Sequence, residues 1–414
     1  MSISPLLVST FDLEGGAARA ALRLHRGLLG RGMSSQLIVQ LKSSDTQGVI
    51  GPTGRSARAM ARVRPVLDSS ILGLYPGRSG DMFSSAWLPG GFARNIKDID
   101  HDVLNVHWTA AGFLAIEEAG RQEKPLVWTL HDMWLFTGGC HYSGGCLGYL
   151  ESCGKCPQLG SGRATDLSRV VWKRKARSWG DLALAVVSPT NWLAEAARRS
   201  SLLKDATIHV IPNGVDTRQF QPFDRSLSRE ALGLQQDKVL LAFGAFTTSQ
   251  PRKGRVLLLE ALRKLGPRID PTAVEFVVFG AGHLAQNAEI PIATKYVGRL
   301  YDDVSLALLY SAVDLVVVPS LYEAHSLVAV ESMACGTPCV AFRVEGLSEV
   351  IDDRENGLLA RPFDTDDLAD KIAEMATNNA FRARAAIKAR AKALKVWDID
   401  LVARQYEALF DSVD

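Results

Sequence analysis

Long apolar runs are missing from this sequence. No apolar stretch approaches the roughly 18 residues that a helix needs to cross a bilayer, and the opening MSISPLLVST lacks the charged start and apolar core of a signal peptide. Strong charge of one sign is missing too, because the formal net charge is only +2. No global field therefore indicates nucleic acid as a partner. We expect a cytoplasmic protein that binds no nucleic acid.

Cysteine is scarce, yet four of the six cysteines fall in one stretch, GGCHYSGGCLGYLESCGKCP. In a reducing compartment, such a cluster favours thiolate metal ligation over disulfides, and a structural zinc is one interpretation. The second pair has the C-x2-C spacing of a zinc half-site, whereas the first pair is more widely spaced. Cysteines that only pack, without a ligand, are the alternative. The four candidates are Cys140, Cys146, Cys153 and Cys156.

Strand-like and helix-like segments alternate along the chain. Short apolar runs such as LVWTLHD, IHVIPNG and KVLLAFGAF are separated by amphipathic stretches such as AARAALRLHRGLLGRG. This alternation predicts parallel sheets covered by helices on both faces. Because 414 residues exceed one ordinary core, we expect an α/β fold with two doubly wound domains.

Domain boundaries follow from where the strand–helix pattern restarts. We expect an N-terminal domain over residues 1–210, with a cysteine-rich insertion around 138–158, and a C-terminal domain over 211–395. Residues 396–414 are amphipathic, and no further strand remains for them to cover, so they are expected to cross back to the N-terminal domain. The polar stretch FDRSLSREALGLQQD is interpreted as an interdomain connection.

Chemistry is expected in the loops after the strands, where ligands of open parallel sheets bind. Gly15 and Gly16 precede a helix, whose free N–H groups attract anions; a tight turn is the alternative. Arg252 and Lys253 could neutralise a diphosphate, and a solvated basic turn is the alternative. The loop Gly280-Ala281-Gly282 belongs to the same set. No G-x-G-x-x-G is present, which counts against a nicotinamide or flavin enzyme.

Two carboxylates in YEAHSLVAVESMACGTP carry the most specific pattern. Ser326 is a plausible helix cap, so Glu323 precedes the helix and Glu331 lies inside it. At helical rise the two glutamates lie roughly 12 Å apart, a separation that suits the two ends of an extended ligand. Carboxylates can accept hydrogen bonds from ribose and sugar hydroxyls, with phosphate at the helix start between them.

A basic, aromatic segment, SRVVWKRKARSW, permits two interpretations. Trp172 and Trp179 with Lys173 and Lys175 could form a surface for anionic lipid, and peripheral contact with the inner face of a membrane would follow. The alternative is a solvated helix that covers the sheet.

The stretch from PSLYEAHSL to DTDDLA, with its E-x7-E pattern, resembles the donor-binding region of retaining nucleotide-sugar glycosyltransferases of family 4. The likeness includes the early Gly-Gly loop, VIPNGVDTRQF, RKG and MACGTP. The stretch HDMWLFTGGCHYSGGC is similar to the colanic-acid-type exopolysaccharide subgroup. The resemblance implies the GT-B fold, in which two Rossmann-like domains face each other across a cleft.

The resemblance also implies roles for particular residues. It gives catalytic roles to His131, Glu323 and Lys253, with His131 near the reacting carbon of the sugar. The donor would be held by Gly15, Gly16, Arg252, Lys253, Glu323, Ser326, Leu327, Val328 and Glu331, with Glu331 on the ribose. Arg252 would replace the family's arginine, whose place is taken by Thr247 and Thr248. Apart from the resemblance, His107 in NVHW ends a strand and could line the acceptor site, with a packed histidine as the alternative; Trp108 and Asp132 are further acceptor candidates.

The implied reaction is transfer of a sugar, with retention of configuration, from a nucleoside-diphosphate sugar to a glycan or lipid-linked acceptor. Synthesis of a bacterial exopolysaccharide or cell-surface polysaccharide is the expected setting. Catalysis needs no cofactor in this scheme. A sugar-nucleotide epimerase and a non-catalytic sugar-nucleotide binder or assembly protein are the alternatives.

Overall fold

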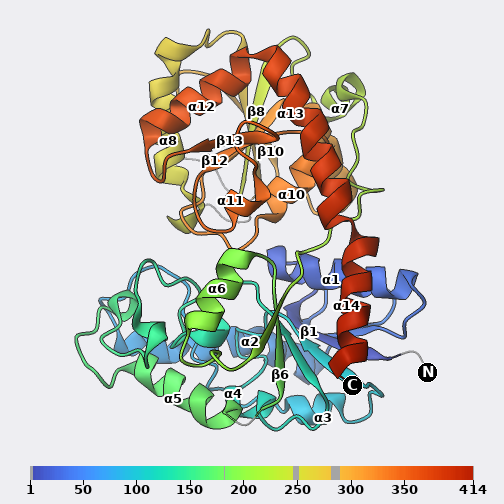
Figure 1. Cartoon of the computed structure of the whole chain (residues 1–414), viewed down its shortest axis with the longest axis vertical. Coiled ribbons are helices and arrows are strands. Elements are labelled where there is room, and N and C mark those ends of the chain that lie inside the picture. Colours follow the sequence, from blue (N-terminus) through green and yellow to red (C-terminus); the bar gives the residue numbers. More distant parts are fainter. Residues whose placement is uncertain (1–2, 181, 246–250, 281–289, 414) are drawn as a thin grey trace. The chain divides into compact units, whose positions relative to one another are not determined.

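The computed structural model describes residues 3–180, 182–245, 251–280 and 290–413. The chain divides into two compact units (Figure 1). Unit 1 comprises Met1–Gly214 together with Asp400–Asp414, and unit 2 comprises Val215–Ile399. None of the described helices has the length and apolar character needed to cross a membrane.

Unit 1 is built on a seven-stranded sheet with the order β3-β2-β1-β4-β5-β6-β7. Every pair of neighbouring strands in it is parallel. The central strands are buried along their length, as expected for a sheet covered on both faces. The strands are β1 (Pro5–Phe11), β2 (Gln36–Leu41), β3 (Val49–Ile50), β4 (Val103–Val106), β5 (Leu126–Thr129), β6 (Leu184–Ser188) and β7 (Thr207–Val210).

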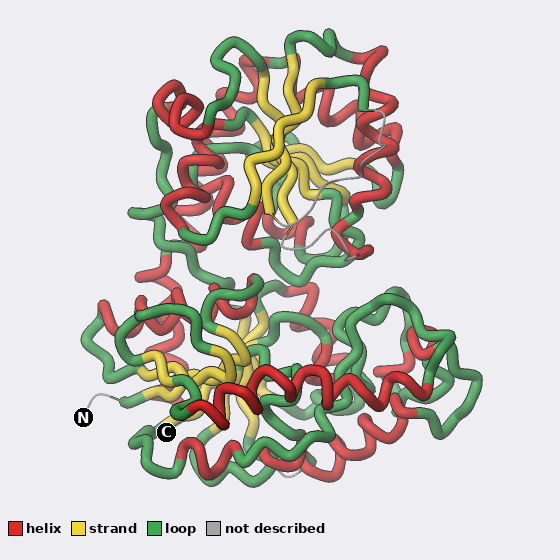
Figure 2. Tube along the Cα trace, turned by 180° about the vertical axis from the view of Figure 1, so that it is seen from behind, coloured by secondary structure: helices red, strands yellow, loops and turns green. Residues whose placement is uncertain are grey.

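Helices surround the sheet of unit 1, and Figure 2 shows the same arrangement in unit 2. Side-chain caps define where several begin; the Asp166 carboxylate, for example, accepts the N–H groups of Ser168 and Arg169 at the start of α5. The helices of unit 1 are α1 (Gly16–Gly30), α2 (Arg55–Ser69), α3 (Phe92–Ile96), α4 (Ile116–Ala119), α5 (Leu167–Trp179), α6 (Asn191–Arg199) and α14 (Ile399–Val413). Short 3₁₀ turns occupy Ser70–Leu74, Trp134–Phe136, Gly148–Leu150 and Pro157–Leu159.

The last helix, α14, is part of the core of unit 1. Its apolar side chains, including Phe410, pack in the same buried cluster as residues of β1, α1 and β2. The hydroxyl of Tyr406 lies 3.0 Å from that of Thr129 at the end of β5, and both side chains are buried. Arg31, after α1, pairs with Glu407.

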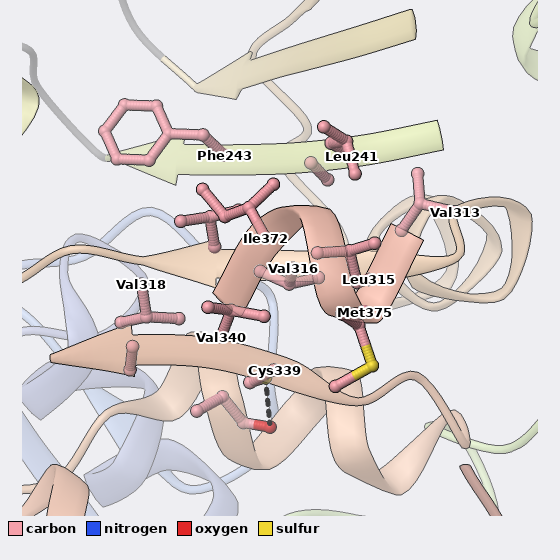
Figure 3. Close-up of a cluster of buried hydrophobic side chains, with 14 of the residues drawn as sticks. Leu241, Phe243, Val313, Leu315, Val316, Val318, Cys339, Val340, Ile372 and Met375 are labelled. Carbon is pink, nitrogen blue, oxygen red and sulfur yellow. Dashed lines mark hydrogen bonds between the residues drawn. The ribbon is translucent and has the colours of Figure 1, made fainter. Parts of the chain in front are cut away.

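Unit 2 contains a six-stranded parallel sheet with the order β10-β9-β8-β11-β12-β13. Figure 3 shows its core, where Val316 and Val318 of β11 and Val340 of β12 lie among apolar side chains from the adjacent strand β8 and from helix α12. The strands are β8 (Val239–Ala245), β9 (Val274–Gly280), β10 (Ala293–Gly298), β11 (Leu315–Val318), β12 (Cys339–Phe342) and β13 (Gly357–Ala360). Two parallel-sheet α/β domains, as predicted, are therefore confirmed.

The helices of unit 2 are α7 (Arg225–Leu232), α8 (Arg255–Leu265), α9 (Asp303–Ala312), α10 (Leu327–Ala334), α11 (Leu347–Val350), α12 (Thr365–Thr377) and α13 (Asn379–Lys392). Pro251–Lys253 and Gly266–Arg268 form 3₁₀ turns, and Ala393–Trp397 is π-helical.

The chain passes between the units twice, and a bridge inside unit 2 determines where. The N–H of Val215 donates to Trp397, 2.8 Å away, and the N–H of Ile399 donates to Val215 at 3.0 Å. This pairing keeps both segments in unit 2 up to the bridge. The unit boundaries consequently lie about four residues beyond 210 and 396, where the sequence places them.

The interpretation of FDRSLSREALGLQQD as an interdomain connection is wrong. The segment forms α7, which packs against α9 within unit 2. The reason is a buried charge that the sequence pattern does not reveal. Asp314, just before β11, accepts hydrogen bonds from Arg225 and Arg229 of α7, each at 2.8 Å.

These two arginines give a matched test of the fold. The Arg229 side chain is 5% exposed and that of Arg225 is 51% exposed, although both pair with Asp314. We expect Arg229→Ala to lower the free energy of unfolding by about 3–5 kcal/mol, because it leaves a buried carboxylate without its main partner. Arg225→Ala should cost less than about 1 kcal/mol. Urea denaturation measures both, and equal losses would contradict this assignment.

Candidate functional site

The carboxyl ends of the strands in unit 1 gather three predicted residue groups at one edge of the sheet. Gly15 directly precedes α1 beyond β1, with a positive φ of 87° that favours glycine. No side-chain hydrogen bond caps this helix start, where Gly15 is partly exposed and Gly16 is exposed. Trp108 follows β4 and its carbonyl accepts the N–H of Thr10 in β1, at 2.8 Å. His131 follows the neighbouring strand β5.

A pair of stacked histidines lies at this edge. His107 Nδ1 and His131 Nε2 are 2.9 Å apart, and His107 Nε2 is 2.9 Å from Asn105 Oδ1. Burial lowers the pKa of His107 well below its ordinary value and that of His131 to about 4, so both rings are neutral at pH 7. Since Asn105 Oδ1 can only accept, His107 donates from Nε2 and accepts from His131. His131 then keeps Nδ1 as a hydrogen-bond acceptor.

Asp132, the next residue, has the opposite character. Its Oδ2 accepts from His141 Nδ1 at 2.6 Å and from Trp108 Nε1 at 3.1 Å, and its Oδ1 accepts the N–H of Trp134 at 2.8 Å. Burial opposes ionisation, but the charge and hydrogen bond of His141 outweigh it and hold the pKa of Asp132 below its ordinary value. The carboxylate is therefore ionised and held from three sides.

These side chains line one pocket within unit 1, and sequence reasoning missed two of its supports. His107, Trp108, His131, Asp132 and His141 are among the lining residues. His141 orients Asp132, and the hydroxyl of Ser84 lies 2.9 Å from His141 Nε2. His141 stands in the cysteine-rich stretch, whose pattern drew attention only to its thiols. Ser84 carries no sequence signal.

The four clustered cysteines are all free thiols. Burial raises the pKa of Cys140 to about 12 and that of Cys153 to about 11, so these thiols are protonated at neutral pH. Among the described residues, no three His, Cys, Asp or Glu side chains form a group arranged to hold a metal ion. The zinc interpretation stays a prediction, which elemental analysis of the purified protein would decide.

A buried lysine secures the loop beside these thiols. Lys175 of α5 is fully buried, donates to the carbonyls of Trp134 and Thr137, and lies 3.7 Å from the centre of the Trp134 ring. Burial lowers the pKa of Lys175 to about 7. The lysine thereby fixes the chain that follows Asp132.

Helix α5 does not present the aromatic, basic surface that the sequence suggested. Trp179 and Lys175 are buried, and Trp172 donates to the hydroxyl of Ser201 at 3.1 Å. Only Lys173 and Arg177 of the segment's five cationic side chains are well exposed, since Arg174 pairs with Glu117. The alternative, a helix that covers the sheet, describes α5 better.

In unit 2, a buried carboxylate meets two cations. Glu323 Oε2 lies 2.6 Å from Lys253 Nζ and 3.7 Å from Arg252 Nη1, and the hydroxyl of Ser320 donates to it at 3.2 Å. Burial disfavours the charge of Glu323, but Lys253 and Arg252 hold its pKa below the ordinary value. Burial likewise lowers the pKa of Lys253, and Glu323 opposes that change.

Gly254 makes the contact between the two cations and Glu323 possible. Gly254 follows Lys253 with φ 71°, and a Cβ there would stand 1.7 Å from the carbonyl oxygen of Pro319. The N–H of Leu321 donates to the carbonyl of Arg252 at 2.7 Å. The turn with the cations is thus pressed against the loop that carries Glu323.

Helix α10 begins beside the same pair. The Ser326 hydroxyl accepts the N–H of Ala329 at 3.4 Å, as a cap should, and Leu327 is the first helical residue. Lys253, Ser326 and Val328 line a second pocket, in unit 2. Glu331 lies in the next turn, where its carboxylate accepts from the buried hydroxyl of Tyr310 at 3.0 Å.

Part of the predicted donor surface cannot be placed. Thr247, Thr248, Ala281 and Gly282 lie outside the described residues. Glu345, by contrast, is described and was not predicted; its Oε2 accepts the N–H of Glu323 at 2.8 Å.

Comparison with known proteins gives the family. Residues 14–219 match the sequence model of Glycosyltransferase Family 4, and residues 237–378 match that of Glycosyl transferases group 1. A D-inositol 3-phosphate glycosyltransferase from Stackebrandtia nassauensis is 37% identical over 406 residues, which cover 93% of this chain and 84% of that protein. The chain belongs to the family 4 glycosyltransferases. It is therefore a glycosyltransferase enzyme.

Other relatives of this glycosyltransferase bear the same name. The protein from Xylanimonas cellulosilytica is 30% identical over 93% of this chain and 89% of its own length. The match to the protein from Saccharomonospora viridis, at 37% identity, covers 42% of this chain and 43% of that relative.

Solved structures share the fold at low identity. Sucrose-phosphate synthase from Thermosynechococcus elongatus superposes with a TM-score of 0.73 at 18% identity, covering 99% of this chain and 98% of that one. Anabaena HepE in complex with UDP-glucose gives 0.68 at 18% identity, covering 99% of this chain and 100% of that one. These neighbours agree with the predicted fold class.

Proposed function

We propose that this glycosyltransferase moves a sugar, with retention of configuration, from a nucleoside-diphosphate sugar to a hydroxyl of a glycan or lipid-linked acceptor. The observation that carries the proposal is the Lys253–Glu323 pair beside the start of α10. Lys253, Arg252 and the first N–H groups of α10 can neutralise the leaving diphosphate, while Glu323 accepts from the sugar. Glu331 would then accept from the ribose.

Retention without a protein nucleophile suits this site. Glu323 is committed to Lys253 and Glu331 to Tyr310, and a carboxylate held in an ion pair is a poor nucleophile. The protein would act by holding donor and acceptor and by stabilising the charge of the departing phosphate. His131, neutral and accepting at Nδ1, would hold a hydroxyl of the donor sugar.

The pocket of unit 1 favours an uncharged acceptor. It is lined by neutral His107 and His131 and by ionised Asp132, with no lysine or arginine among its lining residues. Asp132 can accept a hydrogen bond from a sugar hydroxyl, and Trp108 can pack against a sugar face. A phosphorylated acceptor would be repelled by Asp132.

The name of the curated relatives supports a second candidate acceptor. Proteins up to 37% identical to this chain are called D-inositol 3-phosphate glycosyltransferases. A small phosphorylated cyclitol is therefore the competing substrate class. Exopolysaccharide or cell-surface polysaccharide synthesis is the setting that we favour, because no lysine or arginine stands among the described residues that line the acceptor pocket.

Helix α2 is the surface that we propose for peripheral membrane contact. Val66 is 69% exposed, and Met60, Val63 and Leu67 are also exposed large apolar side chains of this helix. At 100° per residue, they form a stripe beside exposed Arg55, Arg58 and Arg62, opposite buried Ala61 and Asp68. An apolar stripe bordered by arginines fits the boundary of an anionic lipid layer. Such contact would bring the enzyme to a lipid-linked acceptor.

Donor binding can be tested with a thermal-shift panel of UDP-glucose, UDP-N-acetylglucosamine, GDP-mannose and ADP-glucose. At least one should raise the melting temperature, since a ligand at 100 times its Kd stabilises the native state by about 2.7 kcal/mol. Lys253→Met should weaken that ligand about tenfold to a hundredfold, because it removes a charged hydrogen-bond donor. Lys264→Met, on α8 and paired with Asp366, is the matched control. No shift with any donor, or an unchanged shift in Lys253→Met, would refute the donor site.

Acceptor choice can be tested by comparing aryl glycosides and extracted lipid-linked glycans with D-inositol 3-phosphate. We expect transfer to uncharged sugars, and Asp132→Asn should lower that rate at least about tenfold because it removes the accepting charge. The donor's thermal shift should not change, since Asp132 is not among the residues that we propose to contact the donor. Asp98→Asn, in an exposed turn, is the control. Faster transfer to D-inositol 3-phosphate would replace the favoured acceptor with the second candidate.

Membrane contact can be tested by flotation with phosphatidylglycerol vesicles. Reversing the charge of Arg58 and Arg62 should reduce binding at least about tenfold, since each arginine near an anionic surface contributes about 1 kcal/mol. Reversing Lys173 and Arg177, the exposed cations of α5, should change little. The opposite ranking of the two double variants would move the contact surface to α5.

A further inference from the structure

Glu345 occupies a strained position beside the donor pair. It lies in the turn between β12 and α11, with a φ of 39°. This is the left-handed region that favours glycine, so a glutamate there is held against a conformational cost. Residues kept in such conformations cluster at functional sites.

The turn between β12 and α11 forms hydrogen bonds with both the N–H and the carbonyl of Glu323. Glu345 Oε2 accepts the N–H of Glu323 at 2.8 Å, and the N–H of Gly346 donates to the carbonyl of Glu323 at 3.0 Å. A Cβ at Gly346 would stand 2.0 Å from the carbonyl oxygen of Ala324, so the turn packs tightly here. The backbone of Glu323 is therefore held through its N–H and its carbonyl by two consecutive residues.

The carboxylate of Glu323 is held separately, by Lys253 and Ser320. Where that carboxylate stands depends on the backbone that carries it. We propose that Glu345 is a positioning residue of the donor site, which sets the place of Glu323 for the donor sugar. This inference rests on the donor role that is proposed above for Glu323.

The charges around Glu345 add an effect of pH on diphosphate binding. Burial, together with the charge of Glu323, raises the pKa of Glu345 to about 8, while the N–H of Glu323 and the charge of Arg252 oppose this rise. At pH 7, the two cations Arg252 and Lys253 therefore face the single negative charge of Glu323. Above about pH 8, a second carboxylate cancels the remaining positive charge, so diphosphate binding weakens as the pH rises.

Three substitutions separate position from charge. Glu345→Gln keeps an oxygen that can accept the N–H of Glu323 but cannot ionise. Glu345→Ala removes both properties and retains the unfavourable φ. Glu345→Gly removes both and relieves the conformational cost. Glu349→Gln makes the same amide change on α11 and serves as the control.

Calorimetry between pH 6 and 9 would measure the Kd of the nucleotide sugar that gives the largest shift in the donor panel, and of its nucleoside diphosphate. At pH 7, Glu345→Gln should stay within about twofold of wild type for both ligands. Glu345→Ala and Glu345→Gly should weaken the nucleotide sugar about tenfold, the effect of one misplaced charged hydrogen-bond partner, and leave the nucleoside diphosphate nearly unchanged. Glu345→Gly should melt no lower than Glu345→Ala.

The change of the Kd above about pH 8 gives the second measurement. In wild type, the affinity for both ligands should fall above about pH 8, and the part of this fall that comes from Glu345 should be absent in Glu345→Gln. Deprotonation of Lys253 also weakens binding at high pH, but that loss persists in Glu345→Gln. If Glu345→Gln loses as much affinity above pH 8 as wild type, the role of Glu345 is overturned while donor binding stands. The same holds if Glu345→Ala binds the nucleotide sugar with wild-type affinity at pH 7. If wild type binds none of the four nucleotide sugars, the proposed function fails first, and the role of Glu345 fails with it.

Discussion

A buried carboxylate, Glu323, and a partly exposed ammonium, Lys253, form the contact on which the chemistry of unit 2 depends. The charge of Glu323 would be costly there alone, since an isolated buried ion costs several kcal/mol. The pair exists because Gly254 lets one turn approach Pro319 and because the β12–α11 turn holds the backbone of Glu323. Close packing of the backbone is therefore what brings the two charges together.

In unit 1, too, the contacts of a side chain decide whether it is charged. His131 and Asp132 are neighbours in sequence, yet one is neutral and the other is ionised. The difference comes from their partners, because His131 meets another neutral ring while Asp132 receives three N–H groups. The result is a pocket with hydrogen-bond acceptors and, among the described residues that line it, no lysine or arginine. It suits hydroxyl groups better than phosphates.

Periodicity and strand-end loops were sufficient to predict two parallel sheets and the loops in which Lys253 and Glu323 stand, since those features are local. Contacts between distant segments were not predictable. The polar segment around Arg229 reads as a linker until its partner Asp314, 85 residues away, is known. Lys175 reads as a surface cation because nothing local shows that α5 buries it. Glu345 is hidden for the same reason, as its strain arises from a turn whose backbone the sequence does not specify.

The return of α14 to unit 1 has a consequence for the order in which the protein can be completed on the ribosome. Tyr406 and Phe410 fill the core beside β1 and β5, so unit 1 cannot complete its core until α14 has been translated. Unit 2, encoded in between, has all its described strands available earlier. Until α14 emerges, an incomplete apolar surface on unit 1 remains open to chaperones.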